Sequence, residues 1–144
     1  MRAGGYVELR CRSAFSFLEG ASLPEELAGR AIELGYGAMA LADRGGLYGA
    51  PRFWKAARDA GLRALVGAEV EFLEGRLLLL VESAAGYRRL CRLLTLGHSR
   101  TAAKSELRLS LADLEGESGG LVCLAGGESS PLTEALRRGD ALRA

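Results

Sequence analysis

The sequence Glu8-Leu-Arg-Cys-Arg-Ser13 begins the part of the chain that decides the fold. From Tyr6 to Cys11, aromatic or aliphatic residues alternate with polar ones, which is the pattern of a half-buried β-strand. Ser22-Leu-Pro-Glu25 then predicts a helix start, with Ser22 as N-cap and Glu25 closing a capping box. An apolar stripe follows at helical spacing until Gly35, and the apolar run Ala38–Ala42 predicts a second strand. The stripe consists of Leu27, Ala31, Ile32 and Leu34.

Strands and helices continue to alternate to the end of the chain. This alternation predicts an α/β fold with a largely parallel sheet, and Glu74-Gly75 predicts one β-hairpin. The elements expected after residue 42 are a helix over Arg52–Ala60, strands over Arg63–Leu73 and Arg76–Val81, a helix over Tyr87–Leu96, a helical turn over Leu111–Leu114 capped by Ser110, a buried strand over Leu121–Ala125, and a last helix opened by Ser130-Pro-Leu-Thr-Glu134 and ended by Gly139.

Length and composition are those of a single globular domain over residues 1–144. The chain is 49% hydrophobic and 26% charged with a net charge of +1, which excludes a polycation that binds DNA by bulk charge. The three cysteines lack CxxC spacing and predict reduced thiols of a cytoplasmic protein. No apolar N-terminal segment indicates a secretory signal. The longest apolar run, Leu77–Val81, is too short to span a bilayer, so no membrane contact is expected.

Four segments, in order along the chain, carry a resemblance to a known family. They are Glu8–Ser13, Phe17–Ser22, Leu41–Gly49 and Val66–Glu69. They resemble the N-terminal PHP (polymerase and histidinol phosphatase) domain of bacterial C-family DNA polymerase III alpha subunits, in particular the error-prone branch. The segments Tyr87–Leu94 and Gly120–Gly127 are also similar to that branch, so the resemblance covers essentially the whole chain.

The resemblance implies a distorted β/α barrel, of which this chain supplies the first half. We therefore expect an incomplete barrel with mainly parallel strands and one hairpin, and its unpaired strand edge needs a cover or a partner. The implied parent protein copies damaged DNA in the cytoplasm with nucleotide triphosphates and Mg²⁺, in a later domain. The expected partner is the remainder of that alpha subunit or a homo-oligomer mate, and no cofactor is expected on this chain.

The resemblance also implies a metal site, which this chain has altered. Arginine stands at three positions where the family carries histidine, and acids remain at three others. These former metal-site positions are Arg10, Arg12 and Arg44 for the arginines, and Glu19, Asp43 and Glu69 for the acids. A guanidinium has no lone pair for a metal and stays protonated at any working pH. We expect the arginines to pair with the acids, Asp43 with Arg10 or Arg44, in a module that is structural and non-catalytic.

Two other functions remain open for the same positions. A metal-dependent phosphoesterase or 3′–5′ exonuclease would bind metals on the three acids. An anion-binding module would use the three arginines on pyrophosphate, a nucleotide phosphate or a DNA backbone. A second basic cluster, formed by Arg88, Arg89 and Arg92, occupies one face of a predicted helix and leaves a further DNA contact open.

The remaining candidates are expected to be structural. His98 lies at a helix end, where a solvated cation is favourable. Cys11 should point away from the neighbouring arginines and pack in the core. The glycine-rich loop 44–49 lacks the Walker spacing and is expected to connect a strand to a helix tightly. Phe53 and Trp54 are expected in the core, and Tyr48 is left open as a base-stacking residue.

Overall fold

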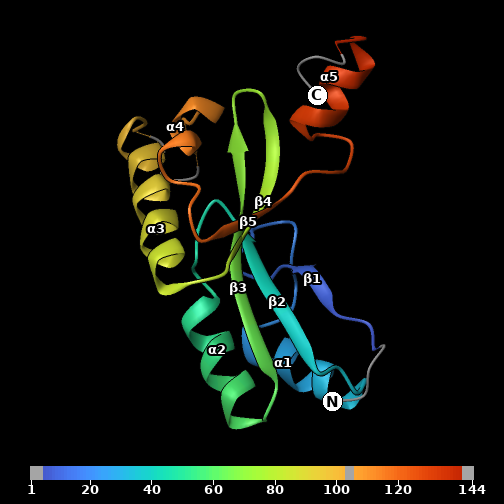
Figure 1. Ribbon diagram of the computed structural model, residues 1–144. Helices are drawn as coiled ribbons and strands as arrows, with labels where there is room; N and C mark the ends of the chain where they lie inside the picture. The colour runs from blue at the N-terminus through green and yellow to red at the C-terminus, as the bar shows by residue number, and fades with distance from the viewer. Residues whose placement is uncertain (1–4, 103–105, 141–144) are drawn as a thin grey trace. The chain divides into compact units, whose positions relative to one another are not determined.

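The computed structural model describes residues 5–102 and 106–140 (Figure 1). These residues form an α/β fold with a five-stranded sheet in the order β1-β2-β3-β4-β5. The strands are β1 Glu8–Cys11, β2 Ala38–Arg44, β3 Arg63–Phe72, β4 Gly75–Val81 and β5 Leu121–Leu124. The helices are α1 Pro24–Glu33, α2 Ala50–Asp59, α3 Ala84–Ser99, α4 Leu111–Glu115 and α5 Pro131–Arg137. The chain divides into two compact units, Met1–Ala68 and Glu69–Ala144.

The first unit is built on a parallel pair of strands and two helices. β1 and β2 pair in parallel, with Glu8 opposite Met39 and Cys11 opposite Leu41. Helices α1 and α2 pack on each other and on β2. Burial of apolar side chains between these elements is the main source of stability for the unit. The buried cluster consists of Ala28, Ala31, Met39, Leu41, Phe53, Ala57 and Leu62.

Helix α1 begins one residue later than the sequence pattern predicted. Leu23, not Ser22, is the N-cap residue, and Pro24 is the first residue of the helix. The carboxylate of Glu26, rather than that of Glu25, accepts a hydrogen bond of 2.7 Å from the Leu23 N–H. The physical reason is Pro24, which has a fixed φ and no N–H and therefore favours the first helical position.

The predicted apolar stripe of α1 is only partly buried. Ile32 and Leu34 are 41% and 51% exposed, whereas Ala28 and Ala31 are buried. The distance between two packed helices depends on the side chains at their contact, so alanines allow α1 and α2 to approach closely. Ala28 and Ala31, with Leu27 packed beside them, therefore form the buried face of this helix, whereas Ile32 and Leu34 of the predicted stripe lie at the surface.

Trp54 in α2 also differs from the prediction. Phe53 is fully buried as expected, but Trp54 is half exposed. The guanidinium of Arg58 lies over the Trp54 ring, 4.7 Å from its centroid. This cation–π contact, one helical turn away, gives the indole a partner at the surface instead of in the core.

The second unit contains antiparallel strands. β4 and β5 pair antiparallel, with Leu79 opposite Cys123 and Val81 opposite Leu121. The turn that joins β3 to β4 lies at Leu73-Glu74, one residue before the predicted Glu74-Gly75, because Gly75 is the first residue of β4. The predicted α/β class and open sheet are thus confirmed, although antiparallel pairing extends beyond the single expected hairpin.

The prediction that β5 is a buried strand was wrong. Val122 and Leu124 are 43% and 37% exposed, and Cys123 is exposed as well. The buried apolar run of this unit lies on β4 instead, at residues 77–80. In the described part of the chain β5 is the last strand of the sheet, with β4 beside it on one side.

The later helices begin where polar caps predict. The N–H of Ser110 donates to the Asp113 carboxylate at 2.8 Å before α4, and Ser130 Oγ accepts from a backbone N–H before α5. Helix α3 is longer than expected and begins after Ser83, whose Oγ accepts from the Gly86 N–H at 3.1 Å. None of the helices within the described ranges is long and apolar enough to cross a membrane.

Candidate functional site

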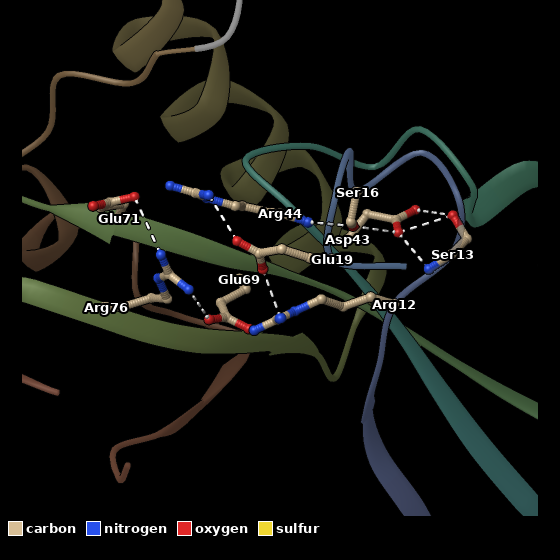
Figure 2. A network of polar contacts seen from close by, with 9 residues as sticks. All are labelled: Arg12, Ser13, Ser16, Glu19, Asp43, Arg44, Glu69, Glu71 and Arg76. Carbon is tan, nitrogen blue, oxygen red and sulfur yellow. Dashed lines mark hydrogen bonds and ion pairs between the residues drawn. The ribbon is translucent and has the colours of Figure 1, made fainter. Parts of the chain in front are cut away.

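Asp43 lies near the end of β2, and its side chain is almost fully buried. The hydroxyl of Ser13 lies 2.9 Å from both carboxylate oxygens, and the Ser13 N–H donates to Oδ1 at 2.8 Å. The Ser16 hydroxyl donates to Oδ1 at 2.8 Å (Figure 2). The N–H of Gly49 donates to Oδ2 at 3.0 Å, and a Cβ at this glycine would lie 2.6 Å from that oxygen. The loop after β1 and the start of α2 therefore close around one carboxylate.

Hydroxyl and backbone donors hold Asp43, and the prediction of an arginine partner was wrong. Arg44 contacts this group through its main chain, because its N–H donates to Ser16 Oγ at 3.0 Å. Several aligned donors can stabilise a buried carboxylate without a countercharge. Sequence reasoning missed Ser13 and Ser16. The available signal was two hydroxyl residues, three positions apart, directly after the first strand.

Glu19 brings two of the predicted arginines together. Its Oε2 lies 2.6 Å from Arg12 Nη1, and its Oε1 lies 2.7 Å from Arg44 Nη1 (Figure 2). The side chains of Glu19 and Arg12 are about four-fifths buried, whereas that of Arg44 is 43% exposed. The expected pairing of guanidinium with carboxylate is confirmed at this position, with one acid between two cations.

Arg10 and Cys11 lie on β1 with different surroundings. Arg10 is exposed, and its N–H donates to Glu8 Oε1 at 2.7 Å. Cys11 packs against the buried cluster of the first unit, as expected. Burial raises the pKa of the Cys11 thiol to about 11, so the thiol is protonated at neutral pH. A protonated thiol is a poor metal ligand, because it is the thiolate that binds metals.

Glu69 in the second unit meets an arginine that the sequence analysis did not single out. Glu69 lies on β3 with its side chain 1% exposed, and Arg76 Nη1 lies 3.2 Å from its Oε1. Arg76 Nη2 also lies 3.6 Å from Glu71 Oε2 (Figure 2). The available signal was the hairpin itself, which brings a basic residue on β4 beside the acids on β3.

Comparison with known proteins identifies the family. Residues 8–144 match the PHP domain family. The chain belongs to the PHP domain family. It is 54% identical over 99 residues to an error-prone DNA polymerase of Anaeromyxobacter sp. (strain K). This alignment covers 65% of this chain and 9% of that protein. It is 46% identical over 131 residues to an error-prone DNA polymerase of Pseudomonas fluorescens (strain Pf-5). This alignment covers 90% of this chain and 13% of that protein. This chain thus spans about a tenth of the length of such relatives.

Solved structures show the same fold. A protein of Bifidobacterium adolescentis assigned as a metal-dependent phosphoesterase matches with a TM-score of 0.54 and 20% identity, over 65% of this chain and 33% of that one. An amidohydrolase of Chromobacterium violaceum matches with a TM-score of 0.54 and 25% identity, over 65% of this chain and 34% of that one. The open sheet therefore corresponds to part of a larger architecture in these proteins.

The three acids that the resemblance placed at metal positions are each contacted by donors of the protein itself. Metals in phosphoesterases need carboxylate and imidazole lone pairs that point into a shared space. Here the oxygens of Asp43 accept from four donor groups, Glu19 lies between two guanidiniums, and Glu69 contacts a third. Within residues 5–102 and 106–140, no group of three His, Cys, Asp or Glu side chains could hold a metal ion.

The second basic cluster of the PHP domain is largely engaged by a neighbouring loop. Arg92 forms two hydrogen bonds with the Glu117 carboxylate, of 3.2 and 2.9 Å. Arg89 Nη1 donates to the Gly119 carbonyl oxygen at 2.7 Å. Arg88 is exposed. Two of the three arginines thus tie residues 117–119 to α3, and the DNA contact left open for this cluster stays a prediction.

Two further candidates, His98 and Tyr48, are partly exposed. His98 is half-buried in the last turn of α3, where the sequence placed it. Tyr48 is 53% exposed, and its ring occupies the space that a Cβ at Gly46 would need. The loop 44–49 is a tight connection between β2 and α2, as predicted.

Proposed function

We propose that this chain is a structural, non-catalytic PHP module of an error-prone DNA polymerase. One observation supports the proposal most strongly: the acids at the family's metal positions are each engaged by donors from the protein itself. Asp43 accepts from hydroxyls and amides, and Glu19 and Glu69 contact guanidiniums. A positive side chain beside a carboxylate supplies the charge that a metal would supply, without its Lewis acidity.

The wider function that follows belongs to a longer polypeptide. The matched region makes up only 9% and 13% of two relatives named error-prone DNA polymerase, so DNA-templated synthesis, repair and translesion synthesis would take place elsewhere in such a chain. The Mg²⁺ and nucleotide triphosphates of that reaction would bind there, in the cytoplasm. The module's part is to pack against the polymerase body and stabilise it.

A nuclease assay on the purified chain tests the non-catalytic role. A single-stranded oligonucleotide labelled at its 3′ end is incubated with the chain and Mn²⁺, Mg²⁺ or Zn²⁺, and p-nitrophenyl phosphate serves as a second substrate. The proposal predicts that product release is no faster than with the Asp43→Asn variant. A metal-dependent rate that Asp43→Asn abolishes would support the phosphoesterase or exonuclease alternative and contradict the proposal.

The second candidate function is anion binding by the arginines. Arg12 and Arg44 both contact the Glu19 carboxylate, and the Arg44 side chain is 43% exposed, so a guanidinium of this group can reach an anion in solution. The amidohydrolase with a similar fold carries a bound sulfate. Fluorescence anisotropy of labelled single-stranded DNA, with pyrophosphate as competitor, tests this candidate. Binding that weakens with salt and is lost in an Arg12→Gln/Arg44→Gln variant would support it; equal binding by both proteins would exclude it.

A further inference from the structure

The loop between β1 and α1 exposes two large apolar side chains. Phe17 is 82% exposed and Leu18 is 89% exposed. We call these two residues the Phe17–Leu18 tip. Burial of a large apolar side chain stabilises a folded protein, so two adjacent exposed ones contribute little to the stability of the isolated fold.

The backbone at the tip also has an unfavourable conformation. Leu18 has a φ of +63°, and within the described residues it is the only non-glycine residue with a positive φ. Glycine adopts this region at no steric cost, whereas a leucine there is strained. The chain therefore keeps a leucine side chain at a position where glycine would suit the fold better.

The polar network described above fixes the residues on both sides of the tip. Ser16, before the tip, donates to Asp43 at 2.8 Å and accepts from the Arg44 N–H. Glu19, after the tip, contacts the guanidiniums of Arg12 and Arg44. The N–H of Gly20 returns to the Ser16 carbonyl oxygen at 2.9 Å and closes the loop. The tip is thus presented by a rigid base, which lowers the conformational entropy lost on binding.

We propose that the Phe17–Leu18 tip seats this module on the remainder of an error-prone DNA polymerase polypeptide, by inserting into an apolar pocket of that protein. The inference rests on the proposed function and adds the surface that mediates it. The network around Asp43 and Glu19, at former metal positions, then has a present role: it positions the tip.

The size of the tip favours a partner within the same polypeptide over a free one. Two such side chains offer roughly 300 Å² of contact surface, because an aromatic residue buries about 150–250 Å². A stable complex between separate proteins buries about 1,200 Å² or more. Covalent linkage raises the effective concentration, so a small contact suffices inside one chain. The aligned relatives have the required length, since this region makes up only 9–13% of them.

Site-specific photo-cross-linking tests the proposal. The aligned region of the Pseudomonas fluorescens error-prone DNA polymerase is replaced by this chain, with photoreactive benzoylphenylalanine at position 17. Position 73 serves as the matched control, because Leu73 is 81% exposed on the hairpin. The expected result is a cross-link from position 17 to one segment of the polymerase body and none from position 73. No cross-link from position 17, or equal cross-linking from both positions, would overturn the proposal.

The isolated chain gives a second test that does not depend on the folding of the chimaera. Phe17→Ser and Leu18→Gly are expected to leave the urea midpoint unchanged or raised, since neither side chain packs in the fold. A lowered midpoint in either variant would mean that the tip belongs to the core. Light scattering checks self-association: a dimer that Phe17→Ser dissociates would assign the tip to a second copy. Both results contradict the proposal, and neither bears on the nuclease assay that tests the proposed function.

Discussion

The buried carboxylate of Asp43 is surrounded by donors of the protein itself. Its donors are the Ser13 and Ser16 hydroxyls and the N–H groups of Ser13 and Gly49, all at hydrogen-bond distance. A protein amide or hydroxyl in this position competes with any metal for the same lone pairs. The residue type could be predicted from the sequence, but its partners could not, because they lie 27 to 30 positions away or across a tight loop.

Asp43→Asn is expected to destabilise the chain by about 3 kcal/mol. The amide nitrogen of asparagine would face one of the N–H donors, from Ser13 or Gly49, and leave that donor buried without an acceptor. Urea unfolding followed by circular dichroism measures the effect. Asp59→Asn, in an exposed pair with Lys55, is the matched control and should leave the midpoint unchanged. Equal midpoints for both variants would contradict the account of Asp43.

Glu19→Gln should lower stability by about 1 kcal/mol at low salt, because Arg12 and Arg44 would then face each other without their shared anion. Added NaCl screens like charges, so the deficit should shrink as the salt concentration rises. Unfolding midpoints of the wild type and Glu19→Gln at about 20 mM and about 1 M NaCl measure this deficit, because the Debye length falls to about 3 Å at 1 M. A deficit that does not depend on salt would mean that packing, not charge, explains the effect.

Cys11 predicts a pH dependence with a definite sign. Burial raises its pKa from 9.0 to about 11, so the folded state binds the thiol proton more strongly than the unfolded state does. Its contribution to stability is present below pH 9 and is lost as the pH rises from 9 to 11. The difference in unfolding free energy between the wild type and Cys11→Ala should therefore decrease between pH 8 and pH 10.5. A constant difference would show that the thiol is not buried in solution.

At the scale of the elements, local signals predicted positions well where they were unambiguous. Ser110 and Ser130 precede α4 and α5 as expected, since each is followed by residues that complete a cap. The N-cap of α1 is Leu23 instead of the predicted Ser22, because Pro24 takes the first helical position. The exposure of β5 could not be predicted, because a short apolar run looks the same in a buried strand and in one at the edge of a sheet.

The β3–β4 hairpin depends on Arg76 as well as on its apolar residues. Arg76→Leu would remove a guanidinium that lies 3.2 Å from the buried Glu69 carboxylate, and we expect a loss of about 2 kcal/mol in unfolding free energy. Replacing both residues, as Glu69→Gln/Arg76→Leu, should recover part of the loss, because the buried charge is then removed. Chemical unfolding of the wild type and the two variants measures the coupling. A double variant less stable than Arg76→Leu would contradict the pairing.

For the whole molecule, strand and helix alternation predicted the α/β class, and the PHP family is confirmed over residues 8–144. The replacement of family histidines by Arg10, Arg12 and Arg44 rests on the resemblance and stays a prediction. The sequence motifs did not predict the partners of Asp43 and Glu69, because Ser13, Ser16 and Arg76 come from turns and a hairpin whose geometry only the fold defines. The chain thus has PHP architecture, and its own hydroxyl, amide and guanidinium groups contact the carboxylates of Asp43, Glu19 and Glu69.

The central claim is that these acids no longer bind a divalent metal ion. Its most direct test is the metal content of the purified chain, measured by mass spectrometry after dialysis against Mn²⁺ and Zn²⁺ and removal of the free metal. The account predicts substoichiometric metal, equal in the wild type and in Asp43→Asn. One tightly bound metal ion per chain in the wild type, absent from Asp43→Asn, would contradict it.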